Sequence, residues 1–160
     1  MISALSDNNP IIADSSGIIY LHRENLFEKL LSCVTCFTTE SVKTELLKKP
    51  DGIENYFTQE KICLLPDTNL DIYAAKMSKT DRGILAAALT TGYSVLSDDR
   101  EICIFCDEND IKFFNSLTAV VLMHEKQIIE LNEAYEAIYN LSKAGRYTRQ
   151  IIRYAFSLLP

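Results

Sequence analysis

The sequence is poor in the residues on which several common enzyme sites depend. It has only two histidines, His22 and His124, so it contains no HExxH zinc motif and offers little material for a histidine-based nucleophile triad. Its five glycines are scattered, at Gly17, Gly52, Gly83, Gly92 and Gly145. Because neither a GxGxxG fingerprint nor a phosphate-binding loop is present, no nucleotide cofactor is expected.

Long apolar runs and a basic charge excess are also missing. No run approaches the roughly 20 residues of a membrane span, and the N-terminus lacks the basic start and apolar stretch of a signal peptide. We therefore expect no membrane association and a cytoplasmic location. The net charge of −6 argues against a protein that coats nucleic acid through a basic surface. It is compatible with a nuclease whose acidic site binds metal ions that in turn hold phosphates.

The five cysteines include two pairs with CxxC spacing, Cys33/Cys36 and Cys103/Cys106. Four thiolates would make a closed zinc site, and redox chemistry is a further alternative. However, Cys33 and Cys36 lie in an apolar run that resembles a strand, where residues three apart face opposite ways. Neither pair carries the glycine or proline that usually shapes a metal-binding turn, so we favour buried, packing thiols.

At 160 residues the chain is expected to form one domain, residues 1–160. Short apolar runs predict strands, and helical patterns lie between them. The expected strands cover 10–13, 33–37, 61–65, 93–97 and 111–114, and the expected helices run to residue 31, over 40–48, from 78 to 91 and from 100. This alternation predicts an α/β three-layer sandwich with a mainly parallel central sheet. From His124 the pattern is helical only, which predicts a helical hairpin over 124–160 packed on the same core.

Acidic residues stand at the ends of apolar runs or at helix starts. Asp14 ends the first run, and Asp98 and Asp99 follow the fourth. Such carboxylates project into the crevice outside the carboxyl ends of the strands, where α/β folds place their ligands. Together with Glu45 and Asp81 they would repel one another unless a divalent cation neutralised them. The sequence therefore predicts a magnesium site.

Four segments in this order resemble the PIN domains of VapC-like ribonucleases. They are Ile12–Leu21, Thr38–Leu46, Asp81–Ala88 and Leu96–Arg100. The first is similar to the family's opening strand and turn, and the second to its helix bearing a glutamate. The third is similar to its small-residue helix that opens with an acid, although many relatives carry glutamate where this chain has Asp81. The fourth is similar to its pattern of a hydroxyl residue two positions before the last acid.

The resemblance implies a site with one or two Mg²⁺ or Mn²⁺ ions and four catalytic acids, Asp14, Glu45, Asp81 and Asp99. Asp14 would bridge the ions, with Asp81 and Asp99 as further ligands and Glu45 holding a water or acting as base. Asp99 fits the spacing better than Asp98, and adjacent residues on an extended segment point to opposite sides, so one of the two is expected to reach the metal.

Each assignment has a purely structural alternative. Asp14 could only open a turn, Asp81 could only complement the positive end of a helix, and Asp99 could only cap one. Glu45 could only pair with a nearby lysine on an exposed helix face. Two hydroxyls, those of Ser16 and Ser97, are candidates for orienting a carboxylate or a water.

Arginines provide candidate contacts for RNA phosphates, although a solvated surface is the alternative for each. Two flank the acids, and three recur at helical spacing in the tail beside tyrosines that could stack on bases: Arg82, Arg100, Arg146, Arg149 and Arg153.

The resulting hypothesis is a metal-dependent endoribonuclease. By its resemblance it would be a homodimer and the toxin of a toxin–antitoxin pair, inhibited by an antitoxin protein. The alternatives are a non-catalytic PIN-like binding or scaffold module, and a DNA nuclease or phosphatase that uses the same carboxylates.

Overall fold

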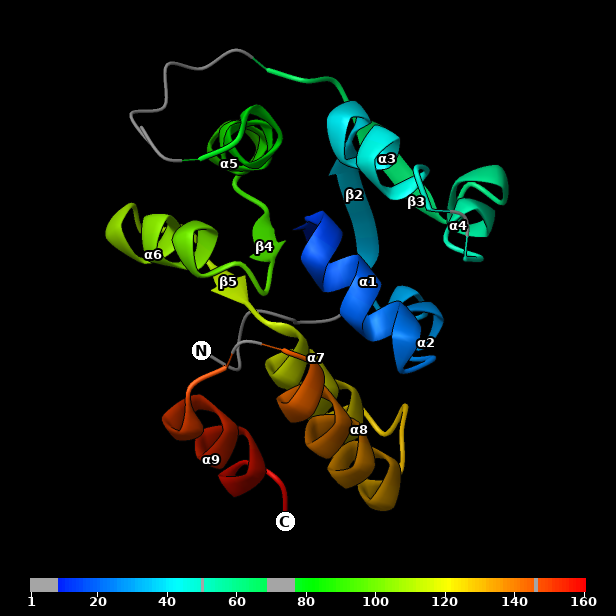
Figure 1. The fold of residues 1–160 in the computed structure, drawn as a ribbon, viewed down its shortest axis with the longest axis vertical. Coiled ribbons are helices and arrows are strands. Elements are labelled where there is room, and N and C mark those ends of the chain that lie inside the picture. Colours follow the sequence, from blue (N-terminus) through cyan, green and yellow to red (C-terminus); the bar gives the residue numbers. More distant parts are fainter. Residues whose placement is uncertain (1–8, 50, 69–76, 146) are drawn as a thin grey trace.

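The computed structural model describes residues 9–49, 51–68, 77–145 and 147–160 and has a five-stranded sheet at its centre (Figure 1). The strands are β1 (Pro10–Ala13), β2 (Thr35–Thr39), β3 (Ile62–Leu65), β4 (Ser94–Leu96) and β5 (Phe113–Phe114), in the spatial order β3-β2-β1-β4-β5. Every strand pairing in this sheet is parallel. The order reverses direction between β1 and β4, and such a switch point opens a crevice at the carboxyl ends of the two strands.

Helices flank the sheet, which confirms the predicted α/β class. They are α1 (Ser15–Arg23), α2 (Phe27–Leu31), α3 (Glu40–Leu46), α4 (Glu54–Thr58), α5 (Lys79–Thr91), α6 (Arg100–Glu108), α7 (Ser116–Glu125), α8 (Leu131–Ala144) and α9 (Arg149–Ser157). Helix α5 packs on β1, β2 and β4, and α6 packs on β5. No helix in the described ranges has the length and apolar character needed to cross a membrane.

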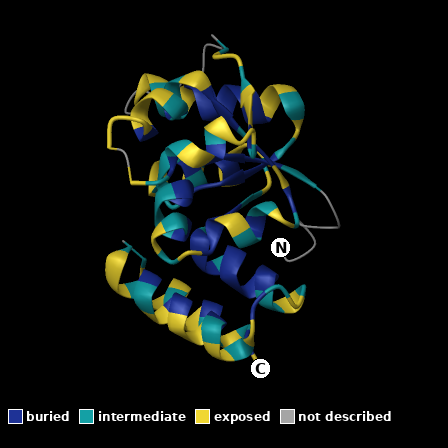
Figure 2. Ribbon diagram, turned by 90° about the vertical axis from the view of Figure 1, so that its right-hand side faces the viewer, coloured by how far each residue is buried: buried dark blue, intermediate teal, exposed yellow. Residues whose placement is uncertain are grey.

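The two central strands are buried on both faces, as parallel strands between helical layers must be. Ile11, Ile12 and Ala13 of β1 and Val95 and Leu96 of β4 are all fully buried (Figure 2). These short runs are apolar without alternation, which is why the sequence identified them as strands. The residue that follows each of these two strands therefore lies at the crevice.

The second strand begins two residues later than the sequence predicted. The chain leaves α2 through a helical turn, in which the amides of Ser32 and Cys33 donate to the carbonyls of Lys29 (3.2 Å) and Leu30 (3.0 Å). That turn holds Cys33 outside the strand, so the prediction of a strand over 33–37 was wrong at its start. Thr38 consequently lies inside β2, and Thr39 alone caps α3 by accepting from the Val42 amide at 3.3 Å.

Helix α7 was not predicted, because the sequence analysis placed the start of the all-helical region at His124. The helix is apolar nearly all around, with Leu117, Val120, Val121 and Met123 buried, so it has no polar face to give a helical period. Its first turn is capped by Asn115, whose side chain accepts from the Thr118 amide at 2.9 Å. The short helix α4 was also missed.

The last two helices form the C-terminal extension, defined here as residues 126–160. Helices α8 and α9 contact each other and α7 (Figure 1). The inner face of α8 buries Ala134, Ala137, Ile138 and Leu141 in the hydrophobic core. Gly145 ends α8, and Thr148 caps α9.

Candidate active site

Asp14 lies at the junction of β1 and α1. Its backbone amide donates to the Leu96 carbonyl of β4 at 3.1 Å, so the residue sits at the switch point. Its side chain caps α1, with Oδ1 accepting from the Gly17 amide at 2.9 Å. The residue is only 3 % exposed. The positive end of α1 therefore faces a buried carboxylate.

Two serine hydroxyls complete the surroundings of Asp14. Ser16 Oγ donates to Oδ1 at 2.8 Å, and Ser97 Oγ, from the end of β4, donates to Oδ2 at 2.6 Å. These are the two hydroxyls that the sequence analysis proposed as orienting groups. Both carboxylate oxygens thus have fixed directions, which leaves the Asp14 side chain little freedom to rotate.

Burial makes the charged form of Asp14 costly. It raises the pKa of Asp14 from 3.8 to about 7, although hydrogen bonds from Gly17, Ser97 and Ser16 oppose the shift; the nearby negative Asp98 adds to it. No lysine or arginine forms an ion pair with Asp14 anywhere in the described part of the chain. A cation at this position would lower the pKa again and stabilise the ionised form.

Asp98 and Asp99 point to different partners, as expected for neighbours on an extended segment. The Asp98 amide donates to Ser16 Oγ at 2.9 Å, and its carboxylate accepts from the Ser116 amide (3.0 Å), the Ser116 hydroxyl and the Tyr147 hydroxyl. Burial raises the pKa of Asp98. Its carboxylate is therefore occupied by donors from the protein.

Asp99 makes a different set of contacts. Its Oδ1 caps α6 by accepting from the amides of Glu101 (2.8 Å) and Ile102 (3.2 Å), and its own amide donates to Ser97 Oγ at 3.0 Å. The capping role considered for Asp99 is thus real. It uses one carboxylate oxygen, while Oδ2 receives no hydrogen bond from the residues that the structure describes.

Glu45 and Asp81 lie on the neighbouring helices α3 and α5, which contact each other. Glu45 is exposed and lines a pocket of about 450 Å³ together with Ser78 and Thr80 at the start of α5. Asp81 is half-buried in the first turn of α5, where its amide donates to Ser78 Oγ at 3.1 Å.

The structure thus brings Asp14, Ser16, Ser97, Asp98 and Asp99 together through hydrogen bonds. Within the described residues, no hydrogen bond or ion pair joins Glu45 or Asp81 to this group. Nor do any three histidine, cysteine or acidic side chains in those residues form a group that could hold a metal ion.

Contacts made by three polar residues of this region were not predicted from the sequence. Ser116 and Tyr147 both bind Asp98, and Asp67 accepts from the Ser41 hydroxyl at 2.9 Å in the pocket beside Glu45. Asp67 follows β3 after one proline, so the rule that identified Asp14 from its place after a strand would also have found it. Nothing in the sequence pattern pairs Tyr147 with Asp98, because 49 residues separate them.

The candidate RNA-binding arginines lie on the surface. Arg82 and Arg100 are exposed beside Asp81 and Asp99, and Arg149 and Arg153 are exposed on α9. Arg146 lies outside the described residues.

The cysteines are all free thiols, and the two CxxC pairs differ in their setting. Cys33 donates to the Leu30 carbonyl in the turn after α2, and Cys36 is buried in β2. Cys103 and Cys106 both lie on α6, where burial raises the pKa of each to about 12.

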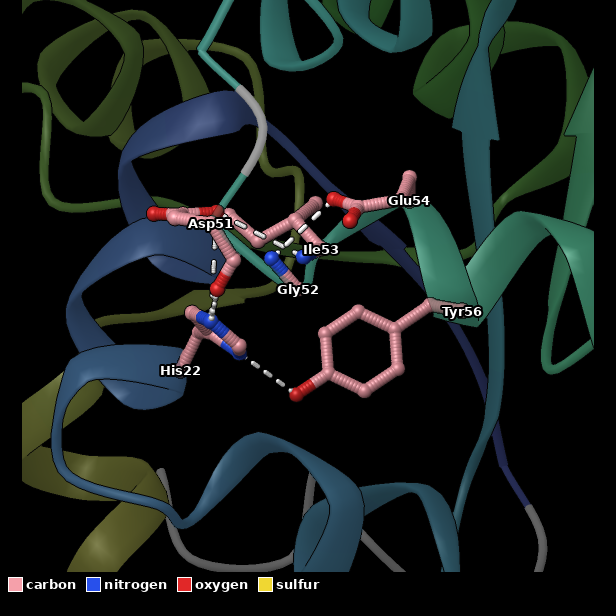
Figure 3. A network of polar contacts seen from close by, with 6 residues as sticks. All are labelled: His22, Asp51, Gly52, Ile53, Glu54 and Tyr56. Atoms are coloured by element: carbon pink, nitrogen blue, oxygen red, sulfur yellow. Dashed lines mark hydrogen bonds and ion pairs between the residues drawn. The ribbon is translucent and has the colours of Figure 1, made fainter.

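A second polar network occupies the other end of α1 (Figure 3). Nε2 of His22 lies 3.0 Å from the Asp51 carbonyl oxygen, and Nδ1 lies 2.7 Å from the Tyr56 hydroxyl. A carbonyl only accepts, so we assign the proton to Nε2, and Nδ1 accepts from Tyr56. His22 and Tyr56 also line a pocket of about 310 Å³. Both ring nitrogens are satisfied within the protein, and the network ties α1 to α4.

Comparison with known families agrees with this architecture. A family model described as a PIN domain matches residues 10–157, which include the whole sheet and most of the C-terminal extension. No curated protein matches the sequence. PIN domains are generally nucleases and typically use divalent metals. On the extent of this match, the chain belongs to the PIN-domain family.

Proposed function

We propose that this protein is a metal-dependent endoribonuclease of the VapC-like type, which hydrolyses RNA phosphodiester bonds. The observation that carries the proposal is Asp14, a buried carboxylate at the switch point of a PIN-domain sheet, held by two serines and an amide and paired with no cation in the described residues. A carboxylate in such surroundings is stabilised by a bound cation.

The oxygen ligands fit Mg²⁺ or Mn²⁺. Mg²⁺ is commonly held by only one or two carboxylates and completes its shell with waters and substrate phosphate. Asp14 and the uncapped oxygen of Asp99 would supply that pair, since Ser97 contacts both residues. Asp98 would serve as a further ligand only by giving up its bonds to Ser116 and Tyr147. When bound, the ion would polarise the scissile phosphate and make water a better nucleophile.

The remaining residues are assigned roles around this pair. Ser16 and Ser97 orient Asp14. Asp81 would contribute to the ion's shell through a water, and Glu45 would hold or deprotonate the attacking water. Exposed arginines bind the RNA phosphates and offset the net charge of −6: Arg82, Arg100, Arg149 and Arg153 in the described ranges, together with Arg146.

The biological setting is proposed from the resemblance alone. VapC-like proteins commonly dimerise and are blocked by an antitoxin segment that enters the site. We therefore propose a homodimer and an antitoxin partner. A neighbouring reading frame for a small protein that binds this chain would support that setting, and its absence would contradict it.

The activity is tested by incubating the protein with RNA, single-stranded DNA and a generic phosphoester, each with Mn²⁺ and with a chelator. We expect RNA cleavage that needs the metal and falls at least about 100-fold in Asp14→Asn and in Asp99→Asn. Asparagine caps helices as well as aspartate does, so Asp99→Asn removes charge without removing the cap. Asp107→Asn, on the exposed side of α6, is the matched control and should cleave normally.

Other outcomes identify the alternatives. Cleavage of DNA alone would indicate a DNA nuclease and not a ribonuclease. Release of phosphate from the generic ester would indicate a phosphatase. No cleavage of any substrate would leave a non-catalytic binding module.

A further inference from the structure

Tyr147, in the segment between α8 and α9, contacts the acidic site. This name denotes the hydrogen-bonded group described above, which comprises Asp14, Ser16, Ser97, Asp98 and Asp99. Its hydroxyl donates to Oδ1 of Asp98, the oxygen that also accepts from the Ser116 amide at 3.0 Å. Oδ2 of Asp98 accepts from the Ser116 hydroxyl. Donors from the start of α7 and from the C-terminal extension therefore converge on one carboxylate at the end of β4.

The position of the Tyr147 ring is fixed by packing as well as by this hydrogen bond. The ring is half-buried against the hydrophobic core. A Cβ atom added to Gly145 would lie 2.7 Å from Cδ2 of the ring, which is closer than real side chains approach. Gly145 has an extended backbone, so glycine is needed here for space and not for its conformational freedom.

A short path of hydrogen bonds leads from Asp98 to Asp14. The Asp98 amide donates to Ser16 Oγ at 2.9 Å, and Ser16 donates to Asp14. The next amide, that of Asp99, donates to Ser97 Oγ at 3.0 Å, and Ser97 also donates to Asp14. Both serines that orient Asp14 are thus held by backbone amides of the segment that Asp98 anchors.

We propose that Tyr147 is a positioning residue of the acidic site, through which the C-terminal extension sets the alignment of Asp14 and Asp99. The proposal rests on the proposed metal-dependent nuclease function for its effect on catalysis. Anchoring the Asp98 side chain fixes the backbone of 97–99, and this backbone fixes the hydroxyls of Ser16 and Ser97. A residue of the C-terminal extension, outside the sheet, then holds the carboxylates of the acidic site in position.

The direct test is Tyr147→Phe, which removes the hydroxyl and keeps the ring. Outer partners of metal-site ligands are typically worth about 10- to 100-fold in metal affinity or activity. We expect Mn²⁺ affinity and kcat for RNA to fall by about 10-fold, with KM nearly unchanged because no substrate contact is removed. Tyr139→Phe is the matched control: Tyr139 is an exposed tyrosine of α8, outside the proposed RNA contacts, and should behave as the original protein does.

A second variant perturbs the same contact without touching the hydroxyl. Gly145→Ala forces the Tyr147 ring to move, so it should weaken Mn²⁺ binding in the same direction as Tyr147→Phe. Normal Mn²⁺ affinity and kcat in both variants would overturn the proposal.

A readout without metal separates this inference from the proposed function. In the metal-free protein, backbone amide NMR shifts of Gly17, Asp98 and Asp99 should change in Tyr147→Phe and stay constant in Tyr139→Phe. Unchanged shifts in Tyr147→Phe would overturn the positioning role even if the protein proves to be a nuclease. Changed shifts in a protein that binds no Mn²⁺ would support the coupling and contradict the nuclease function.

Discussion

The two ends of helix α1 carry polar networks of opposite character. At its start, Asp14 is buried, holds hydrogen bonds from Ser16, Gly17 and Ser97, and still has its pKa raised to about 7. Near its end, each ring nitrogen of His22 has a hydrogen-bonding partner, the Tyr56 hydroxyl or the Asp51 carbonyl. The first network therefore leaves a charge uncompensated, while the second is complete in itself.

This difference distinguishes a candidate functional site from a structural network. Hydrogen bonds to Tyr56 and Asp51 engage both ring nitrogens of His22, and this network needs nothing more to tie α1 to α4. A buried carboxylate remains costly even with three donors, because desolvation outweighs them. Strongly perturbed groups of this kind concentrate at functional sites.

The largest expected effect concerns stability and pH. The folded-state pKa of Asp14, about 7, lies above its ordinary value of 3.8, so the unfolded chain releases this proton first as pH rises. The contribution of Asp14 to the free energy of unfolding should therefore fall between about pH 4 and pH 7, by about 4 kcal/mol in total. Asp14→Asn should lack that decline and be the more stable protein at pH 7. Denaturant unfolding without metal, from pH 4 to 8, measures it, and parallel curves for the two proteins would contradict it.

A smaller effect is expected from Ser97→Ala. The change removes the donor to Asp14 Oδ2 and leaves the Asp99 amide without its acceptor. Loss of partners for buried polar groups costs about 1–3 kcal/mol, and Mn²⁺ affinity should fall about 10-fold. Ser94→Ala, a buried serine on the same strand, is the control for β4 and should leave Mn²⁺ affinity intact. Equal Mn²⁺ affinities in Ser97→Ala and the original protein would refute the orienting role.

The smallest effect should come from the other end of α1. Tyr56→Phe deprives His22 Nδ1 of its donor and should reduce the free energy of unfolding by about 0.5–1.5 kcal/mol. Mn²⁺ binding should not change, because the network contains no group of the acidic site. Thermal denaturation and a Mn²⁺ titration on the same sample test both statements. Weakened Mn²⁺ binding would show that the two networks are coupled.

The fold was largely predictable because its two central strands, β1 and β4, are short and buried on both faces. The runs at 10–13 and 93–97 stood out from the helices, so the sequence alone sufficed to place the acids after them at the crevice. The start of β2 was predicted two residues too early because a helical turn after α2 precedes the strand. Helix α7 was missed because it is buried on nearly all sides, so its sequence shows no alternation of polar and apolar faces.

The candidate site was predictable only in part. Ser16 and Ser97 were named from the sequence as candidate orienting hydroxyls, and both donate to the carboxylate of Asp14 in the structure. The choice between Asp98 and Asp99 could not rest on spacing alone, because it depends on partners from α7 and the C-terminal extension. The roles of Glu45 and Asp81 stay predictions.

Binding of Mn²⁺ to the protein in solution tests whether Asp14 holds a cation. Electron paramagnetic resonance of free Mn²⁺ should show saturable binding to the original protein and to Asp107→Asn, and none to Asp14→Asn. Absence of binding by the original protein, or undiminished binding by Asp14→Asn, would exclude a cation site at Asp14.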